Sequence, residues 1–290
     1  MTERYLIINA DDYGMCYSAN EAVEHLFNEG FITSATLMTP CPWAEDAISR
    51  AKRNKKMRVG LHLTFNSEWK LYKWGPVCRT KVLSSILDSN GYFYSDVASF
   101  LKTAQPDDVI AEMEAQLDFM VKRGYRPTHV DNHMGSLYGL AGRSFLQEVF
   151  AFCAKNQFNF RLPRSTEAFG PVPETVKQQL PEMVEMASRM GIGILDHLCS
   201  HTVALTPSDS YETYRDYYLN LIRNARPGIT EIYLHPAKES EELKAITSNW
   251  QRRVWEYRLM LDDMVMKTIE SEGIKLVGWT DAPFRANGTI

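Results

Sequence analysis

The sequence predicts an α/β fold, specifically an irregular (β/α) barrel of seven to eight strands. Strand-like apolar runs alternate with helical patterns seven or eight times along the 290 residues, which indicates parallel strands joined by helical crossovers. No composition break marks a linker, so we expect a single domain over residues 1–290. At this length a barrel is favoured over an open doubly wound sheet.

The first half of the chain contains four predicted strands separated by helices. Ser18 and Glu21 have the spacing of a helix capping box. Proline favours the first helical position and glycine ends a helix, and both occur at the expected places. Strands are expected at 5–10, 33–38, 58–63 and 128–131, and helices at 18–29, after Pro42 and from Pro106 to Gly124.

The second half repeats the alternation four more times. Gly191 and Gly273 each follow a helical pattern and mark its end. Strands are expected at 158–162, 193–196, 231–235 and 275–278, and helices at 144–155, from Pro173 to 190, at 208–225 and at 249–272.

One long connection interrupts this rhythm at about 64–104. It is rich in aromatic residues, among them Trp69 and Trp74, and Asn90-Gly91 is a turn signal within it. A long connection of this kind in an α/β chain is more often a functional loop than a simple linker. We therefore expect an aromatic-rich insertion in the barrel.

The composition argues against several classes of protein. A net charge of -4 without a dense Lys/Arg stripe argues against a nucleic-acid partner. No apolar run approaches the ~18 residues of a membrane span, and the first strand begins too early to leave room for a signal peptide. The five scattered cysteines contain no CxxC pair, which indicates reduced thiols. We expect a cytoplasmic protein with no membrane partner.

Charged and polar side chains collect at the C-terminal ends of the predicted strands, where the catalytic groups of a barrel converge. Asp11 and Asp12 are neighbours and repel each other unless a cation or a shared proton offsets the repulsion. Imidazoles with one carboxylate suit a divalent ion that keeps open positions for water. The full set is Asp11, Asp12, His62, His129, Asp131, His133, Arg161 and His235.

The run His129-Val130-Asp131-Asn132-His133 has a geometric consequence. Alternate residues of an extended chain share a face, so His129, Asp131 and His133 are predicted to point the same way. One of them could bind a metal while a neighbour orients it. His197 and His201 form a further pair near a strand end, for which a second metal site, a substrate loop or a structural role all stay open.

Four motifs give the sequence a resemblance to a known family. It resembles the YdjC-like carbohydrate deacetylases, which include bacterial chitooligosaccharide deacetylases. The resemblance implies an irregular (β/α) barrel related to the polysaccharide deacetylases, with a divalent metal held by one Asp and two His. The motifs are Asn9-Ala10-Asp11-Asp12-Tyr13-Gly14, Gly60-Leu61-His62-Leu63-Thr64, Thr128-His129-Val130-Asp131-Asn132-His133 and Leu234-His235-Pro236.

The resemblance also implies roles for individual residues. Asp12, His62 and His133 match the metal ligands. Asp11 matches the general base, His235 the general acid, and Arg161 an arginine that positions the catalytic carboxylate in related deacetylases. Apart from the resemblance, we expect His129 and Asp131 to orient the ligands and Trp69, Trp74 and Tyr138 to contact the sugar, since aromatic rings stack on its C–H face.

The implied reaction is hydrolysis of an N-acetyl group on an amino sugar or a short chitooligosaccharide by a metal-bound water. Magnesium or zinc is the expected ion, with cobalt or manganese as alternatives. Relatives imply a homodimer. Family members commonly continue the third motif with further histidines, which this chain lacks after His133, and the difference concerns the substrate more than the metal.

Three other readings use the same residues. A non-haem iron oxygenase has the same two-His-one-carboxylate ligands, but the second Asp argues against it. A catalytically degenerate barrel that only binds sugar would explain the shortened histidine run. An acidic pair that takes up phosphate, as in receiver domains, would leave the histidines without a role.

Overall fold

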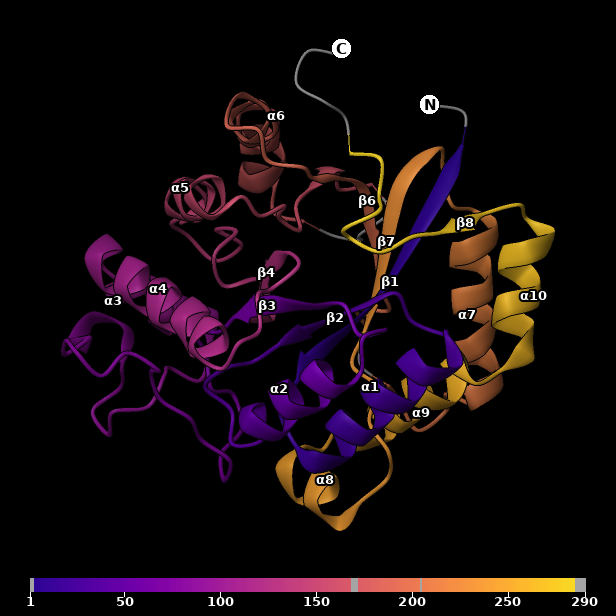
Figure 1. Ribbon diagram of the computed structural model, residues 1–290, viewed down its shortest axis with the longest axis horizontal. Coiled ribbons are helices and arrows are strands. Elements are labelled where there is room, and N and C mark those ends of the chain that lie inside the picture. The colour runs from indigo at the N-terminus through magenta and orange to yellow at the C-terminus, as the bar shows by residue number, and fades with distance from the viewer. Residues whose placement is uncertain (1–2, 168–171, 204, 285–290) are drawn as a thin grey trace.

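In the described part of the chain, eight parallel strands form one sheet, and helices cover its outer side (Figure 1). The computed structural model describes residues 3–167, 172–203 and 205–284. The strand order is β4-β3-β2-β1-β7-β6-β5, with β8 beside β1. The strands are β1 Arg4–Tyr13, β2 Ser34–Leu37, β3 Val59–Leu63, β4 Val130–Asn132, β5 Pro163–Ser165, β6 Leu195–Cys199, β7 Gly228–Leu234 and β8 Lys275–Leu276.

The segment that precedes β5 closes this sheet into an irregular barrel. The N–H of Val130 in β4 donates to the carbonyl of Asn159, and the N–H of Phe160 donates to the carbonyl of Gly193, each at 3.0 Å. The predicted barrel is therefore confirmed. The predicted strand at 158–162 is reduced to one bridge, because the N–H of Leu162 turns back to the carbonyl of Phe160.

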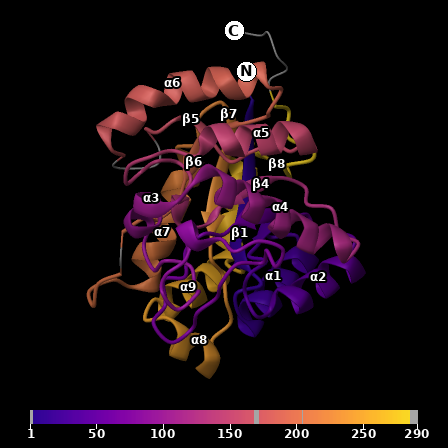
Figure 2. The ribbon, with the colours of Figure 1, turned by 90° about the vertical axis from the view of Figure 1, so that its left-hand side faces the viewer.

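Helices connect the strands as the alternation predicts. Figure 2 shows α6 beside β5 at the upper end of the molecule, next to α5. No helix in the described ranges is long and apolar enough to cross a membrane. The helices are α1 Tyr17–Glu29, α2 Ala44–Arg53, α3 Val97–Thr103, α4 Pro106–Lys122, α5 Leu146–Asn156, α6 Glu174–Arg189, α7 Tyr211–Arg223, α8 Glu241–Ile246, α9 Trp250–Met260 and α10 Asp263–Ser271.

Several local predictions were wrong for identifiable reasons. The capping box at Ser18 does not form: α1 begins one residue earlier, after Cys16, and the Ser18 hydroxyl instead accepts a hydrogen bond from Ser240. The helix predicted at 249–272 is split, since the Asp262 side chain accepts from the N–H of Met264 and starts α10. The short helix α3 within the aromatic-rich insertion was missed.

Strand β1 is the centre of the sheet and carries the first motif. Its side chains are buried on both faces of the sheet from Leu6 to Tyr13, as expected for a parallel strand covered on both sides. The strand continues three residues beyond its predicted end at Ala10. Its register against β2 shifts between Ala10 and Tyr13, and within this irregularity Asp12 has a left-handed φ of 59°. This bend directs the two carboxylates.

Candidate active site

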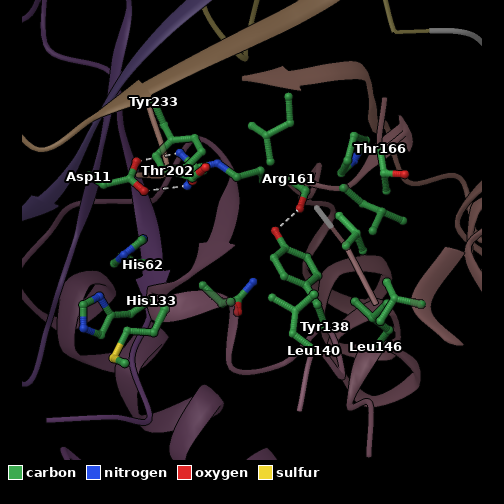
Figure 3. Close-up of a pocket in the computed structure, with 18 of the residues that line it drawn as sticks. Asp11, His62, His133, Tyr138, Leu140, Leu146, Arg161, Thr166, Thr202 and Tyr233 are labelled. Carbon is green, nitrogen blue, oxygen red and sulfur yellow. Dashed lines mark hydrogen bonds and ion pairs between the residues drawn. The ribbon is translucent and has the colours of Figure 1, made fainter. Parts of the chain in front are cut away.

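The C-terminal ends of the strands surround a cavity of about 410 Å³. Figure 3 shows Asp11, His62 and His133 on one side of this cavity and Tyr138 and Arg161 at its middle. The lining also includes Asp12 and His235. Residues predicted from five different strands or their ends thus meet in one place, as the convergence argument requires.

Asp12 and two histidines form a group with the geometry of a metal site. One ligand atom from each of Asp12, His62 and His133 lies within 4.8 Å of the others. Asp12 Oδ1 is 3.2 Å from His133 Nδ1 and 3.5 Å from His62 Nε2. This oxygen is buried and has no hydrogen-bond partner, which is costly unless a cation or a donor reaches it. The residues therefore fit a divalent ion.

A carboxylate stands behind each histidine of this group. Asp131 Oδ1 lies 2.6 Å from His62 Nδ1, and Glu68 Oε2 lies 3.0 Å from His133 Nε2. These contacts orient the rings and leave the other nitrogen of each facing Asp12, which is the usual arrangement behind metal-binding histidines. Glu68 belongs to the aromatic-rich insertion, so that segment contributes directly to the site.

The same carboxylates change the acidity of the histidines. Burial alone would lower the pKa of His62, but Asp131 and Asp12 outweigh burial and raise it to about 9. Burial likewise opposes the charge on His133, yet Glu68 and Asp12 raise its pKa to about 10. Without a metal, both rings are therefore protonated at neutral pH.

Arg161 holds the second aspartate. Its Nη1 and Nη2 donate to Asp11 Oδ2 and Oδ1 at 2.7 and 2.6 Å, while Nη1 also reaches Asp131 and Nε reaches Glu231. Burial would raise the pKa of Asp11, but the guanidinium outweighs burial and lowers it. Asp11, His62 and Asp131 also cluster closely, but Arg161 already supplies the cation there.

His235 approaches the cavity from the end of β7, opposite an anchoring carboxylate. Glu256 in α9 accepts the backbone N–H of His235 at 2.6 Å and lies 3.6 Å from its Nδ1. Glu256 also accepts from Tyr214 and Arg252. Burial opposes its charge, but these contacts lower the pKa of Glu256 below its usual range. His235 is thus anchored through its backbone N–H and its Nδ1 side while it lines the cavity.

Two of the three predicted sugar contacts do not line the cavity. The Trp74 ring is buried and donates to the carbonyl of Asn66, and Trp69 packs edge-on against Trp74. Tyr138 does line the cavity, where its hydroxyl bonds the carbonyl of Arg161. Both tryptophans nevertheless lie beside site residues, since the Trp74 ring packs edge-on against His133 and the Arg253 guanidinium lies over the Trp69 ring; their contact with a sugar stays a prediction.

The other candidate histidines lie at different distances from the site. His129 stacks on Trp279 with ring centroids 4.7 Å apart, and neither metal-site group of the described residues includes it; burial lowers its pKa. The prediction that His129 and His133 point the same way is therefore wrong. His133 begins a turn of 3-10 helix and faces Asp12, whereas His129 packs against Trp279. His201 lines the cavity, whereas His197 contacts the carbonyl of Pro227. Neither of this last pair joins a metal-site group among the described residues.

Sequence reasoning missed a set of ionic partners. Arg253 in α9 donates to Asp12 Oδ2 at 2.6 Å, so one oxygen of this carboxylate pairs with an arginine while the other faces His62 and His133. Glu68, Glu231 and Glu256 were missed as well. The four-residue spacing of Arg252 and Glu256 on one helix could have predicted their ion pair. No sequence pattern could have predicted the pair of Arg253 with Asp12, because the two residues are far apart along the chain.

Comparisons with known proteins agree with this geometry. The family model described as YdjC-like protein matches residues 5–271. A carbohydrate deacetylase of Thermoanaerobacter pseudethanolicus is 24% identical over 96% of this chain and 98% of its own length. One from Geobacillus stearothermophilus is 26% identical with the same coverage. A chitooligosaccharide deacetylase of Yersinia enterocolitica is 27% identical over 68% of this chain and 81% of its own length.

A solved structure shares the fold. An Enterococcus faecalis protein provisionally described as a cellobiose-phosphate cleavage protein superimposes with a TM-score of 0.77. It is 23% identical, and the match covers 96% of this chain and 98% of the other. The irregular barrel is therefore a fold already found in a crystal.

Proposed function

Because the chain belongs to the YdjC-like family, we propose that it is a metal-dependent hydrolase that removes N-acetyl groups from an amino sugar or a short chitooligosaccharide. The relatives named as carbohydrate and chitooligosaccharide deacetylases support the reaction class. The observation that carries the proposal is the free, buried Oδ1 of Asp12, which faces two histidines beside a second carboxylate.

The metal would be held by Asp12, His62 and His133. A divalent ion at such a position lowers the pKa of water and polarises an amide carbonyl. The choice among magnesium, zinc, cobalt and manganese stays a prediction. Arg253 and the carboxylates that contact the histidines would hold the three ligand side chains in position before the metal binds.

Two side chains would handle the protons. Asp11, kept ionised and oriented by Arg161, accepts a proton from the attacking water. His235, anchored by Glu256, donates a proton to the departing nitrogen. The C–N bond breaks, water supplies oxygen to the acyl carbon, and acetate and a free amine result.

The arrangement favours hydrolysis over the rival readings. A second ionised carboxylate directly beside the ligands has a role as a base in hydrolysis but none in the iron oxygenase reading. A degenerate sugar-binding barrel gives no reason to keep all three ligands together with their orienting carboxylates. The cysteines in the described ranges are all free and buried, which supports a reducing compartment such as the cytoplasm. The homodimer stays a prediction.

Acetate release from N,N'-diacetylchitobiose and from single N-acetyl sugars tests the proposal. The protein is first stripped with a chelator, and each divalent metal is then added back in turn. We expect one or more metals to restore release, and Asp11→Asn to lose it by about 100- to 10,000-fold while still binding metal. Asp108→Asn is the control, since Asp108 is a buried aspartate paired with Lys81 outside the cavity. Full activity of Asp11→Asn would show that the base is another group.

A further inference from the structure

The cavity continues beyond the candidate metal site into a region lined by aliphatic side chains. In Figure 3, Leu140 and Leu146 lie across Tyr138 and Arg161 from His62 and His133. We call this region the apolar half. Its aliphatic lining is Leu140, Leu146, Leu162, Pro163, Val172, Val176, Leu180 and Met183.

Helix α6 supplies one wall of the apolar half. Val176, Leu180 and Met183 are spaced four and three residues apart, so they lie on one face of the helix. That face lines the cavity, while the remaining surface of α6 is largely exposed and only Leu180 and Ala187 are buried. The apolar stripe of α6 therefore borders a space of ligand size.

The apolar half offers a sugar little to bind. Among the described cavity residues from Tyr138 to Met183, Arg161 is the single charged one, and its guanidinium already contacts Asp11, Asp131 and Glu231. The polar side chains there are Tyr138, Ser144, Thr166 and Gln179, against eight aliphatic ones, so the hydroxyl groups of a second sugar ring would regain only part of the hydrogen bonds they lose to water. Aliphatic walls instead favour an alkyl group.

We infer that the substrate is an amphipathic N-acyl amino sugar whose alkyl portion occupies the apolar half. The alkyl chain belongs either to the acyl group or to the aglycone of the sugar, since both lie close to the amide. This inference rests on the proposed hydrolase function and narrows its substrate. It predicts that a single sugar with an alkyl chain is preferred to a longer chitooligosaccharide.

Two homologous substrate series distinguish the two sources of the chain. One series lengthens the acyl group of N-acylglucosamine from two to eight carbons, and the other lengthens the alkyl group of alkyl N-acetylglucosaminides over the same range, below their micelle concentrations. We expect kcat/KM to rise by about fourfold per methylene in one series until the space is filled. A rise in neither series overturns the inference, even where N-acetylglucosamine itself is hydrolysed.

Variants on α6 locate the effect. Val176→Asn and Met183→Gln place a polar group in the apolar half and should reduce the ratio of kcat/KM between the longest and shortest substrates by about tenfold or more. Lys177→Asn and Glu182→Gln are the matched controls, because both residues are exposed on the same helix. An unchanged ratio in the first pair contradicts the proposed location.

Direct binding separates this inference from the proposed function. Octyl glucoside carries an alkyl chain but no amide, and its binding is measured by calorimetry with the metal-loaded protein and with Val176→Asn. Saturable binding that Val176→Asn weakens by about tenfold supports the apolar half even if no acetate is ever released. Acetate release without any alkyl binding or chain-length effect would keep the hydrolase and overturn the amphipathic substrate.

Discussion

The two halves of the cavity are built on opposite principles. On the metal side, each proposed catalytic side chain has a charged partner: Arg161 holds Asp11, Arg253 holds Asp12, and Glu256 holds His235. In the apolar half, most of the lining side chains are aliphatic, and Arg161 is the one charged residue among the described cavity residues from Tyr138 to Met183. The metal side therefore tolerates few changes, because removing one partner of an ion pair leaves a buried charge without its counterion. The apolar half can be reshaped by single substitutions of similar size.

The largest expected contrast between the halves is their response to pH. Below about pH 9 both His62 and His133 are protonated without metal, and metal must displace both protons. Metal affinity should therefore rise by about 100-fold per pH unit between about pH 6 and pH 8. Octyl glucoside binding should not change with pH over this range.

Calorimetry in two buffers of different ionisation enthalpy measures this effect. About two protons should be released per metal bound at pH 7, given the raised pKa values of the two rings. Release of none would show that the histidines are not the ligands, or that they are already neutral.

The next contrast concerns proton donation by His235. His235→Asn should lower kcat for the N-acetyl amide by about 100- to 10,000-fold, because an amine leaves poorly without a proton. Hydrolysis of 4-nitrophenyl acetate should change by less than about tenfold, since its leaving group needs no proton. The control is His197→Asn, whose ring contacts a backbone carbonyl of Pro227 instead. Equal losses on amide and ester would contradict the general-acid role.

Glu68 allows a milder test of the metal side. Glu68→Gln keeps the shape but weakens the contact to His133 Nε2, so metal affinity should fall by about 10- to 100-fold. Competition with a coloured chelator measures the change. Glu45→Gln serves as the control, because Glu45 pairs with Arg123 on the outside of the molecule. An unaltered affinity would leave Glu68 with a packing role only.

The smallest expected effect lies in the stability of the apolar half. Val176 is half-buried on the cavity face of α6, so Val176→Ala should lower the free energy of unfolding by only about 0.5 to 1 kcal/mol. Ile8→Ala in the fully buried β1 should cost about 3 kcal/mol. Urea unfolding compares the two. Similar costs would mean that α6 is part of the core and not a replaceable wall.

The residues predicted as metal ligands lie together in the structure, whereas the sequence contained no sign of the apolar half. Asp12, His62 and His133 can be recognised in the sequence because carboxylates and imidazoles at strand ends have few structural uses. Leu180 and Met183 look like any other residues of an amphipathic helix, and no pattern tells whether such a stripe faces a core or a cavity. The sequence likewise left the burial of Trp74 undecided, since an aromatic ring suited to a sugar is equally suited to packing.

Long-range ion pairs were equally invisible. Arg253 and Asp12 are 241 residues apart, and only the folded barrel brings α9 against the end of β1. The predicted helix boundaries were wrong where a side chain bonds the backbone of its own segment. Asp262 is an example, because its carboxylate caps the start of α10 and so divides one predicted helix into two.

Helix α9 gives the site a late assembly step during protein synthesis. Its Arg253 contacts Asp12 and its Glu256 contacts His235, and both α9 residues leave the ribosome after every strand that carries the candidate catalytic groups. A nascent chain released only as far as Pro236 contains all four motifs but lacks Arg253 and Glu256. Metal retained by chains arrested before and after α9 would then reveal whether the centre matures only when translation is almost complete.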